Sequence, residues 1–211
     1  NIDKRADFVE NSFVDLSDNI LKDIDCVIHL AALKAAGESM ENPIKYSNQN
    51  IIESIDFINS CVNNNVKNFI FSSSAAVYGF PQYLPIDEKH ALNPINYYGF
   101  TKLMIEQQLS WYNQLKGLNI ACLRYFNAAG YDVEGELNGI EKEPNNLLPI
   151  VLETITGKRE KVEVFGTDYE TRDGSCIRDY VHVNDLASAH LLSLDFLRKE
   201  NRDFVLNYLW L

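Results

Sequence analysis

Short apolar runs alternate with helix-like segments through the first two thirds of the chain, and this alternation constrains the fold most. The runs that are typical of buried strands lie at 25–30, 66–71 and 119–126. One helical stretch opens at Asn42-Pro43, and a second follows Pro94 and ends near Gly117. Strand, helix, strand, helix, strand at this spacing is typical of βαβ units. The sequence therefore predicts an α/β fold built on a doubly wound parallel sheet.

The pattern changes near residue 130, and the second half is typical of an α+β arrangement. We predict a helix over 145–157, strands over 161–165 and 178–183, and a final helix over 185–197 that Asn184 or Asp185 caps. The expected organisation is a sheet domain over 1–128 and a smaller lobe over 129–211. Within that lobe, residues 178–198 are expected to pack back on the first domain.

The charge balance excludes one class of partner. The chain has 19 Lys and Arg against 30 Asp and Glu, a net charge of −11, which repels nucleic-acid phosphates. A few basic side chains inside a cleft could still hold a small diphosphate. No run approaches the roughly 20 apolar residues that span a bilayer, and charged side chains crowd the first 13 residues, unlike a signal peptide. We expect a cytoplasmic protein that binds neither nucleic acid nor membrane.

The cysteines give no sign of a metal centre. Cys26, Cys61, Cys122 and Cys176 are far apart and form no CxxC pair. Zinc ligation and a disulfide framework are therefore not expected, and buried free thiols in a reducing compartment are.

Tyr98 and Lys102 lie four residues apart on the helix that follows Pro94. Their Cβ atoms are therefore about 6 Å apart on one face. A phenol titrates near 10, and a neighbouring ammonium favours the phenolate and lowers that pKa. Such a tyrosine can accept a proton from a hydroxyl group. Alone, a pair at this spacing is more often an exposed amphipathic pair, so its context decides.

That context is a serine run at the end of a strand. Ser72-Ser73-Ser74 directly follows the second apolar run, and Tyr98 comes 24 residues after Ser74. Serines at strand ends often only satisfy free backbone groups. In open parallel sheets, however, ligands bind beyond the carboxyl ends of the strands, here at 31–34, 72–78 and 127–130. We therefore predict that the Ser74 hydroxyl bridges a substrate oxygen and Tyr98.

The same motifs, in order, resemble the UDP-glucose 4-epimerases of the extended short-chain dehydrogenase/reductases. The resemblance runs from about Phe8 to Phe204. The segments that carry it are AALKAAGES (31–39), SSSAAVYG (72–79), YGFTK (98–102), RYFN (124–127), PNNL (144–147) and RDYVHV (178–183). It implies a Rossmann-like sheet, NAD as cofactor, a homodimer, and epimerisation of a UDP-sugar at C4 through a 4-keto intermediate.

The resemblance also implies roles for single residues. The catalytic group is Ser74, Tyr98 and Lys102, with no metal. The residues that match cofactor contacts are Asp15, Leu16, Leu30, Ala31, Ala32, Leu33, Lys34, Gln49, Tyr98, Lys102 and Phe126. The residues that match the substrate pocket are Ser74, Asn127, Asn146, Leu147, Glu163, Val164, Phe165 and Arg178.

Some residues depart from the family pattern or have simpler explanations. Gln49 replaces an Asn, and Ala76 replaces a Thr whose hydroxyl is thereby lost. His29 and His182 lie in strand-like runs and are expected to be core histidines. A structural ion pair is the simpler role for Arg178, although a guanidinium suits bidentate recognition of a diphosphate.

Two other functions remain as alternatives. A nucleotide-sugar 4,6-dehydratase needs an acid and a base after the strand serines, where this chain has Ala75-Ala76. An inactive, truncated nucleotide-binding protein is the second. The chain holds no GxGxxG or GxxGxxG motif, the turn that normally receives a pyrophosphate. The expectation from this is a chain that begins near the third strand of its domain and that alone neither holds NAD tightly nor turns over substrate.

Overall fold

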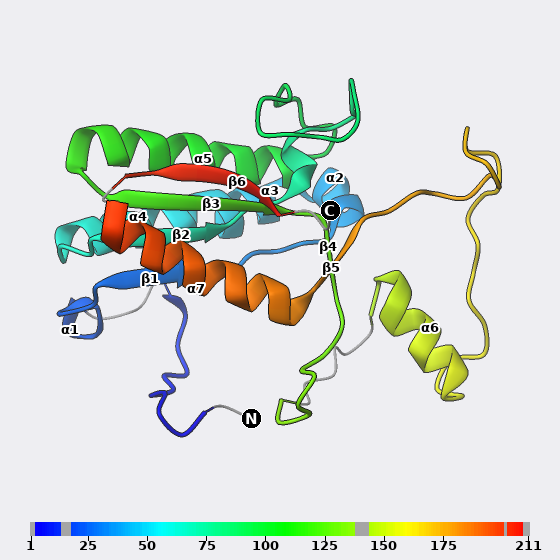
Figure 1. The fold of residues 1–211 in the computed structure, drawn as a ribbon, viewed down its shortest axis with the longest axis horizontal. Helices are drawn as coiled ribbons and strands as arrows, with labels where there is room; N and C mark the ends of the chain where they lie inside the picture. The colour runs from blue at the N-terminus through cyan, green and yellow to red at the C-terminus, as the bar shows by residue number, and fades with distance from the viewer. Residues whose placement is uncertain (1–2, 14–17, 138–143, 201, 209–211) are drawn as a thin grey trace.

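The computed structural model describes residues 3–13, 18–137, 144–200 and 202–208 (Figure 1). Its strands are β1 (Cys26–His29), β2 (Asn68–Ser72), β3 (Asn119–Tyr125), β4 (Asn127–Ala129), β5 (Tyr180–His182) and β6 (Phe204–Tyr208). Its helices are α1 (Asp18–Leu21), α2 (Ala36–Glu41), α3 (Pro43–Tyr46), the π-helical η2 (Ser47–Ile52), α4 (Glu53–Asn63), the 3₁₀ turn η3 (Ala75–Val77), α5 (Tyr97–Lys116), α6 (Leu147–Ile155) and α7 (Val183–Glu200).

The main sheet has four parallel strands in the order β1-β2-β3-β6. In the registers, Ile28 lies opposite Ile70, Ile70 opposite Ala121, and Ala121 opposite Phe204. β2 is buried along its whole length, which explains why its centre, Phe69-Ile70-Phe71, is an unbroken apolar run rather than an alternating one. The predicted parallel sheet is confirmed.

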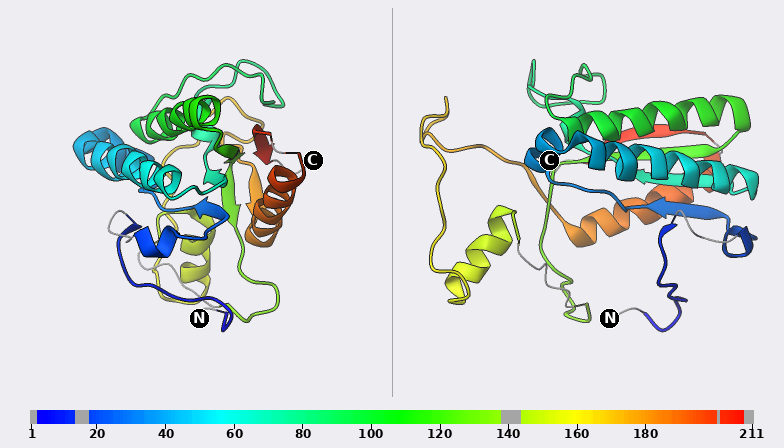
Figure 2. Two further views of the ribbon diagram at one scale, coloured as in Figure 1. Left: turned by 90° about the vertical axis from the view of Figure 1, so that its left-hand side faces the viewer. Right: turned by 180° about the vertical axis from the view of Figure 1, so that it is seen from behind.

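Helices cover both faces of this sheet (Figure 2). Because side chains alternate along a strand, Phe69 and Phe71 of β2 join a core with α4 and α5, whereas Ile70 joins a separate core with α7. The doubly wound, Rossmann-like α/β prediction is therefore also confirmed.

α5 begins and ends where its sequence indicates. The Asn96 side chain caps its first turn by accepting a hydrogen bond from the Gly99 amide at 2.8 Å. Gly117 ends the helix in the left-handed region at φ 69°, which a glycine adopts without steric cost. This helix carries Tyr98 and Lys102 along the sheet.

Two predictions about the second half were wrong. Residues 161–165 form no strand, since no strand of the described residues lies beside them to supply hydrogen bonds, and Phe165 is 92% exposed. α7 begins at Val183, two residues before the prediction, so Asn184 and Asp185 lie inside it. The ring of His182 takes the capping role, because its Nδ1 accepts from the Asn184 amide at 3.2 Å.

Some elements were not predicted at all. α1, α2 and β6 were absent from the expectations, and the helix expected from residue 42 is divided among α3, η2 and α4. β4 and β5 form a small parallel pair, and α6 with the chain after it stands beyond the main sheet (Figures 1 and 2). α7 packs on the main sheet and β6 is one of its strands, although both follow residue 129. The division into lobes at residue 128 remains a prediction.

Among the helices of the described residues, none combines the length and the apolar character needed to cross a membrane. All four cysteines are free, and Cys61 and Cys122 are buried. Within the described residues, no three His, Cys, Asp or Glu side chains gather as metal ligands would.

Candidate active site

A cleft of about 1390 Å³ lies at the carboxyl ends of the strands, where the sequence placed the site. Most of the predicted site residues line it: Leu30, Ala32, Lys34, Ser74, Tyr98, Lys102, Phe126, Asn127, Asn146, Leu147 and Arg178. They come from six separate parts of the chain. The fold therefore brings the predicted catalytic, cofactor and substrate residues to one place.

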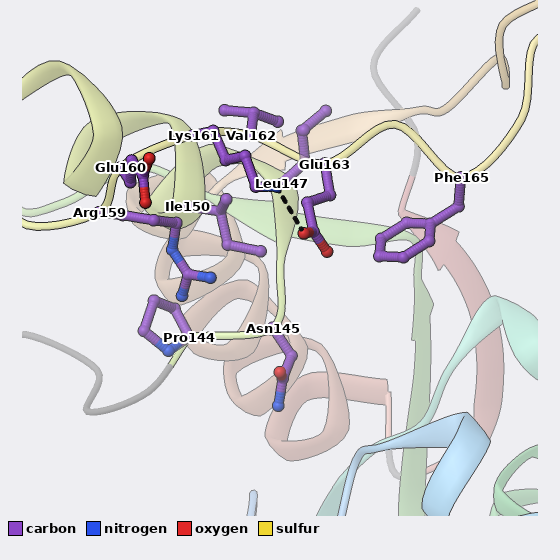
Figure 3. A pocket seen from close by; sticks show the side chains of 10 residues that line it. All are labelled: Pro144, Asn145, Leu147, Ile150, Arg159, Glu160, Lys161, Val162, Glu163 and Phe165. Atoms are coloured by element: carbon purple, nitrogen blue, oxygen red, sulfur yellow. Dashed lines mark ion pairs between the residues drawn. The ribbon is translucent and has the colours of Figure 1, made fainter.

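The remaining predicted residues lie elsewhere. Glu163 and Phe165 line an adjoining hollow of about 560 Å³, in which Lys161 pairs with Glu163 at 3.5 Å (Figure 3). Asn145 and Leu147 line both hollows, so the two are neighbours. Outside the linings of both are Ala31, Leu33, Gln49 and Val164. Asp15 and Leu16 fall outside the described residues.

Tyr98 lies at the N-terminal end of α5 and is held there by its backbone. Its amide donates to Ser39 Oγ at 3.0 Å, and its carbonyl accepts from Thr101 Oγ1 at 2.7 Å. Burial raises the pKa of the Tyr98 phenol to about 12. A hydrogen bond from the Ser74 side chain lowers this pKa, and the charge of Tyr125 raises it. Ser74 is thus the group that favours the Tyr98 phenolate.

Lys102 is only 4% exposed. Its Nζ donates to the Ser72 carbonyl at 2.7 Å and lies 4.7 Å from the centroid of the Phe71 ring and 5.9 Å from that of Tyr98. Burial lowers the pKa of Lys102 to about 8, against the opposing charge of Glu106. Lys102 therefore remains mostly an ammonium at neutral pH.

The Tyr98 phenol does not have the lowered pKa that its neighbour Lys102 led us to expect. The pKa of Tyr98 is raised, because removal of the phenol from water outweighs every other influence. The ammonium is directed at the Ser72 carbonyl rather than at the phenol oxygen. At neutral pH the pair is consequently a neutral phenol beside an ammonium.

Close packing at Gly99 sets Tyr98 beside Ser74. A Cβ on Gly99 would lie 2.4 Å from the carbonyl oxygen of Ala76, so only glycine lets α5 approach η3 this closely. Ser74 caps η3, and its Oγ accepts from the Ala76 amide at 3.2 Å. Gly99 of the YGFTK motif thus allows the close contact between α5 and η3 that brings Tyr98 near Ser74.

Asn50, which the sequence analysis did not single out, holds the chain beside the cleft in place. Its buried amide accepts from the Leu33 N–H at 2.8 Å and donates to the Leu33 carbonyl at 3.0 Å and to Thr101 Oγ1 at 3.2 Å. It therefore ties the chain after β1 to α5. Asn48 and Gln49 on the same helix also carry amide side chains, so no sequence signal singles out Asn50.

The histidines that the sequence singled out lie in structural positions. His29 bonds Ser54 Oγ at 3.2 Å and packs against the rings of Phe13, Phe57 and Phe71. Burial, with the charge of Lys102, lowers the pKa of His29 to about 4, so this side chain is neutral. Its packing matches that of a core residue.

Arg178 is exposed on the wall of the cleft. Its Nη1 donates to the carbonyl of Ile177 at 2.8 Å. Asn127, on the same wall, donates to the Asp179 carbonyl at 2.8 Å. The Arg178 guanidinium keeps donors for an anion that enters the cleft.

The chain is similar to known proteins over most of its length. The model of the NAD dependent epimerase/dehydratase family matches residues 4–207. The UDP-glucose 4-epimerase of Halalkalibacterium halodurans is 47% identical over 85% of this chain, which spans 54% of that relative's length.

Solved structures are similarly close. A crystal structure of UDP-glucose 4-epimerase from Brucella ovis in complex with NAD matches with a TM-score of 0.90 and 42% identity, over 96% of this chain and 64% of that one. A Bifidobacterium longum UDP-glucose 4-epimerase in complex with NAD⁺ and UDP matches with a TM-score of 0.85 and 38% identity, over 95% and 62%. The chain thus spans between half and two thirds of the length of these relatives.

Proposed function

The chain belongs to the NAD dependent epimerase/dehydratase family, and we propose that the whole protein interconverts UDP-glucose and UDP-galactose by epimerisation at C4. The observation that carries the proposal is the meeting of Ser74, Tyr98 and Lys102 in one cleft at the strand ends. Relatives named as UDP-glucose 4-epimerases, at 37–47% identity, support the same reaction.

The residues present fit NAD. The segment 30–34 follows β1, and its residues Leu30, Ala32 and Lys34 line the cleft wall, where a dinucleotide could lie against them. The buried Lys102 ammonium stands beside it as a donor for ribose hydroxyl groups. We propose that Leu30, Ala31, Ala32, Leu33, Lys34 and Phe126 hold the cofactor with Lys102. Asp15, Leu16 and Gln49 are proposed as further contacts. The chemistry that bound NAD supplies is acceptance of hydride from C4 of the sugar and its return to the opposite face.

In the proposed mechanism, Tyr98 first loses its phenol proton to solvent, and the phenolate then takes the proton of the sugar 4-hydroxyl and later returns it. A phenol with a pKa near 12 is a weak acid, so the phenolate must be stabilised while it forms. The Ser74 hydroxyl and the Lys102 ammonium are the groups placed to do this. The 4-keto sugar then turns over in the cleft before Tyr98 reprotonates its oxygen.

We propose that the nucleotide end anchors the substrate while the sugar turns. Arg178 offers its guanidinium to the diphosphate, and Asn127, Asn146 and Leu147 line the same cleft. Glu163, Val164 and Phe165 are proposed to contact the substrate from the adjoining segment. An anchor at the UDP end leaves the hexose free to present either face to the reacting groups.

The dehydratase alternative is not favoured. A 4,6-dehydratase needs an acid and a base beside the tyrosine, but Ala75 and Ala76 form η3 at that place and carry no ionisable group. The test is the product. NMR of the whole protein with UDP-galactose and NAD should show UDP-glucose accumulating toward equilibrium. A 4-keto-6-deoxy sugar, or NAD binding without any product, would replace this function with one of the two alternatives.

We further propose that the protein is cytoplasmic and forms a homodimer. Buried free thiols at Cys61 and Cys122 suit a reducing compartment. On α5, Trp111 is 58% exposed and Leu115, one turn later, is 70% exposed, which makes an apolar surface that a second copy could cover.

Arg178→Ala should weaken UDP binding by about ten- to hundredfold and leave NAD binding nearly unchanged. Charge-assisted hydrogen bonds contribute about 1.5–3 kcal/mol, which corresponds to that range. Calorimetry with UDP alone measures the effect. The matched control is Arg172→Ala, because Arg172 is an exposed arginine on the same segment that does not line the cleft. Equal UDP affinity in the two variants would reduce Arg178 to a structural residue.

A further inference from the structure

A buried ion pair lies directly behind the candidate site. Glu106 is 6% exposed and Arg124 is 4% exposed. Arg124 Nε donates to Glu106 Oε1 at 3.0 Å, and its Nη2 donates to Oε2 at 2.5 Å. Arg124 Nη1 also donates to the Tyr78 hydroxyl at 2.8 Å, which holds the guanidinium in place. Two charges without access to water are therefore fixed by bonds on several sides.

Glu106 also accepts a hydrogen bond from Ser73, a residue next to the site. The Ser73 hydroxyl donates to Glu106 Oε1, and the Ser73 amide donates to the Leu123 carbonyl at 2.9 Å. Ser73 lies between Ser72, whose carbonyl receives the Lys102 ammonium, and Ser74, which lines the cleft. One carboxylate thus ties α5 to the strand end that presents both groups.

Glu106 also lies one helical turn after Lys102 on α5. The three buried charges of Lys102, Glu106 and Arg124 sum to +1, and the charge of Glu106 opposes the loss of the Lys102 proton. Among the described residues, Tyr98 on α5 and His29 on β1 are further titratable groups near Lys102. His190 on α7 bonds the Ser72 hydroxyl at 3.0 Å. Among these groups, Glu106 is the carboxylate whose negative charge stabilises the Lys102 ammonium.

We propose that Glu106, held between Arg124 and Ser73, is a positioning residue for Ser74 and Lys102. Its carboxylate fixes the turn after β2, so that the Ser74 hydroxyl faces Tyr98 and the Ser72 carbonyl receives the ammonium. It touches neither substrate nor cofactor. The catalytic part of this inference rests on the proposed epimerisation, whereas the positioning itself does not.

The mildest test removes only the link from the serine. Ser73→Ala leaves the pair of Glu106 and Arg124 intact and should lower kcat by about tenfold or more, with KM and NAD affinity within about twofold. The matched control is Ser193→Ala, since Ser193 is equally buried and donates to the Ala189 carbonyl at 2.7 Å on α7, outside the site. That control should leave kcat within about twofold.

A double-mutant cycle shows whether the effect passes through Ser74. In a Ser74→Ala background, Ser73→Ala should change kcat by clearly less than about tenfold, because one of the two positioned groups is gone and only Lys102 remains. A full tenfold effect in that background would overturn the proposal. Equal effects of Ser73→Ala and Ser193→Ala in the wild-type background would also overturn it.

Amide hydrogen exchange provides a measurement that does not depend on activity. In η3, the Ala76 amide bonds Ser74 Oγ and the Tyr78 amide bonds the Ala75 carbonyl at 3.1 Å. Ser73→Ala should speed exchange at these amides by about tenfold, while Ser193→Ala should not. Glu106→Gln should speed it at least as much. If the whole protein does not epimerise sugars, this experiment still decides the positioning, and unchanged exchange in both variants would overturn it.

Discussion

Tyr98→Phe should lower kcat by about 10²–10⁴-fold and leave the dissociation constant of NAD within about threefold. The range is that of a general acid–base group. Phenylalanine keeps the ring that packs at the start of α5, and the backbone bonds of this residue to Ser39 and Thr101 are unaffected. The variant therefore removes the proton acceptor alone. Steady-state kinetics with UDP-galactose and calorimetry with NAD measure the two quantities.

The neighbouring tyrosine provides the matched control for this variant. Tyr97 precedes Tyr98 on α5, and its hydroxyl bonds Ser47 Oγ at 2.6 Å rather than lining the cleft. Tyr97→Phe should keep kcat within about threefold. A loss smaller than about tenfold for Tyr98→Phe, or equal losses for the two tyrosines, would remove Tyr98 from the proposed mechanism.

Lys102→Met should lower kcat/KM by about 10²–10⁴-fold and weaken NAD binding. The ammonium is proposed to serve both the phenolate and the ribose, and two charge-assisted contacts of about 1.5–3 kcal/mol each give that range. Without the positive charge the phenolate is less favoured, so the acid limb of the pH–rate profile should move to higher pH. Kinetics across pH and calorimetry with NAD measure these effects.

The melting temperature of Lys102→Met at pH 7 shows whether the variant loses activity through its charge or through damage to the core. Burial lowers the pKa of Lys102 from 10.5 to about 8, so below pH 8 the folded protein carries an ammonium that burial disfavours. An apolar side chain there should not lower the melting temperature at pH 7. Lys45→Met is the control for the loss of a lysine charge elsewhere. Lys45 lies outside the cleft and pairs with Glu38 at 2.5 Å. An acid limb that does not move in Lys102→Met would refute the role of its charge.

Local sequence patterns were sufficient to predict an element whose own residues specify its conformation and its ends. The unbroken apolar run of β2 indicates a strand buried on both faces, and Asn96 and Gly117 mark the ends of α5. β6 and the segment 161–165 depend instead on a partner strand. β6 becomes a strand because β3 lies beside it, whereas no described strand lies beside 161–165. A sequence pattern cannot supply that partner.

The same distinction holds within the site. The motif spacing predicted that Ser74, Tyr98 and Lys102 would meet, because a parallel sheet gathers its carboxyl ends at one edge. The pKa of Tyr98 could not be predicted, since it depends on burial by residues from distant parts of the chain. Asn50 and Glu106 were missed for a related reason. Their partners, Leu33 and Arg124, are brought to them only by the fold.

The central claim is that the C4 hydrogen is transferred within the site and returned to the same sugar, while Tyr98 handles only the hydroxyl proton. NMR of the whole protein with UDP-galactose and NAD in D₂O tests this directly, because a transferred hydrogen never exchanges with solvent. We predict that UDP-glucose forms with protium retained at C4. Deuterium at C4, or no interconversion of the two UDP-sugars, would contradict the claim.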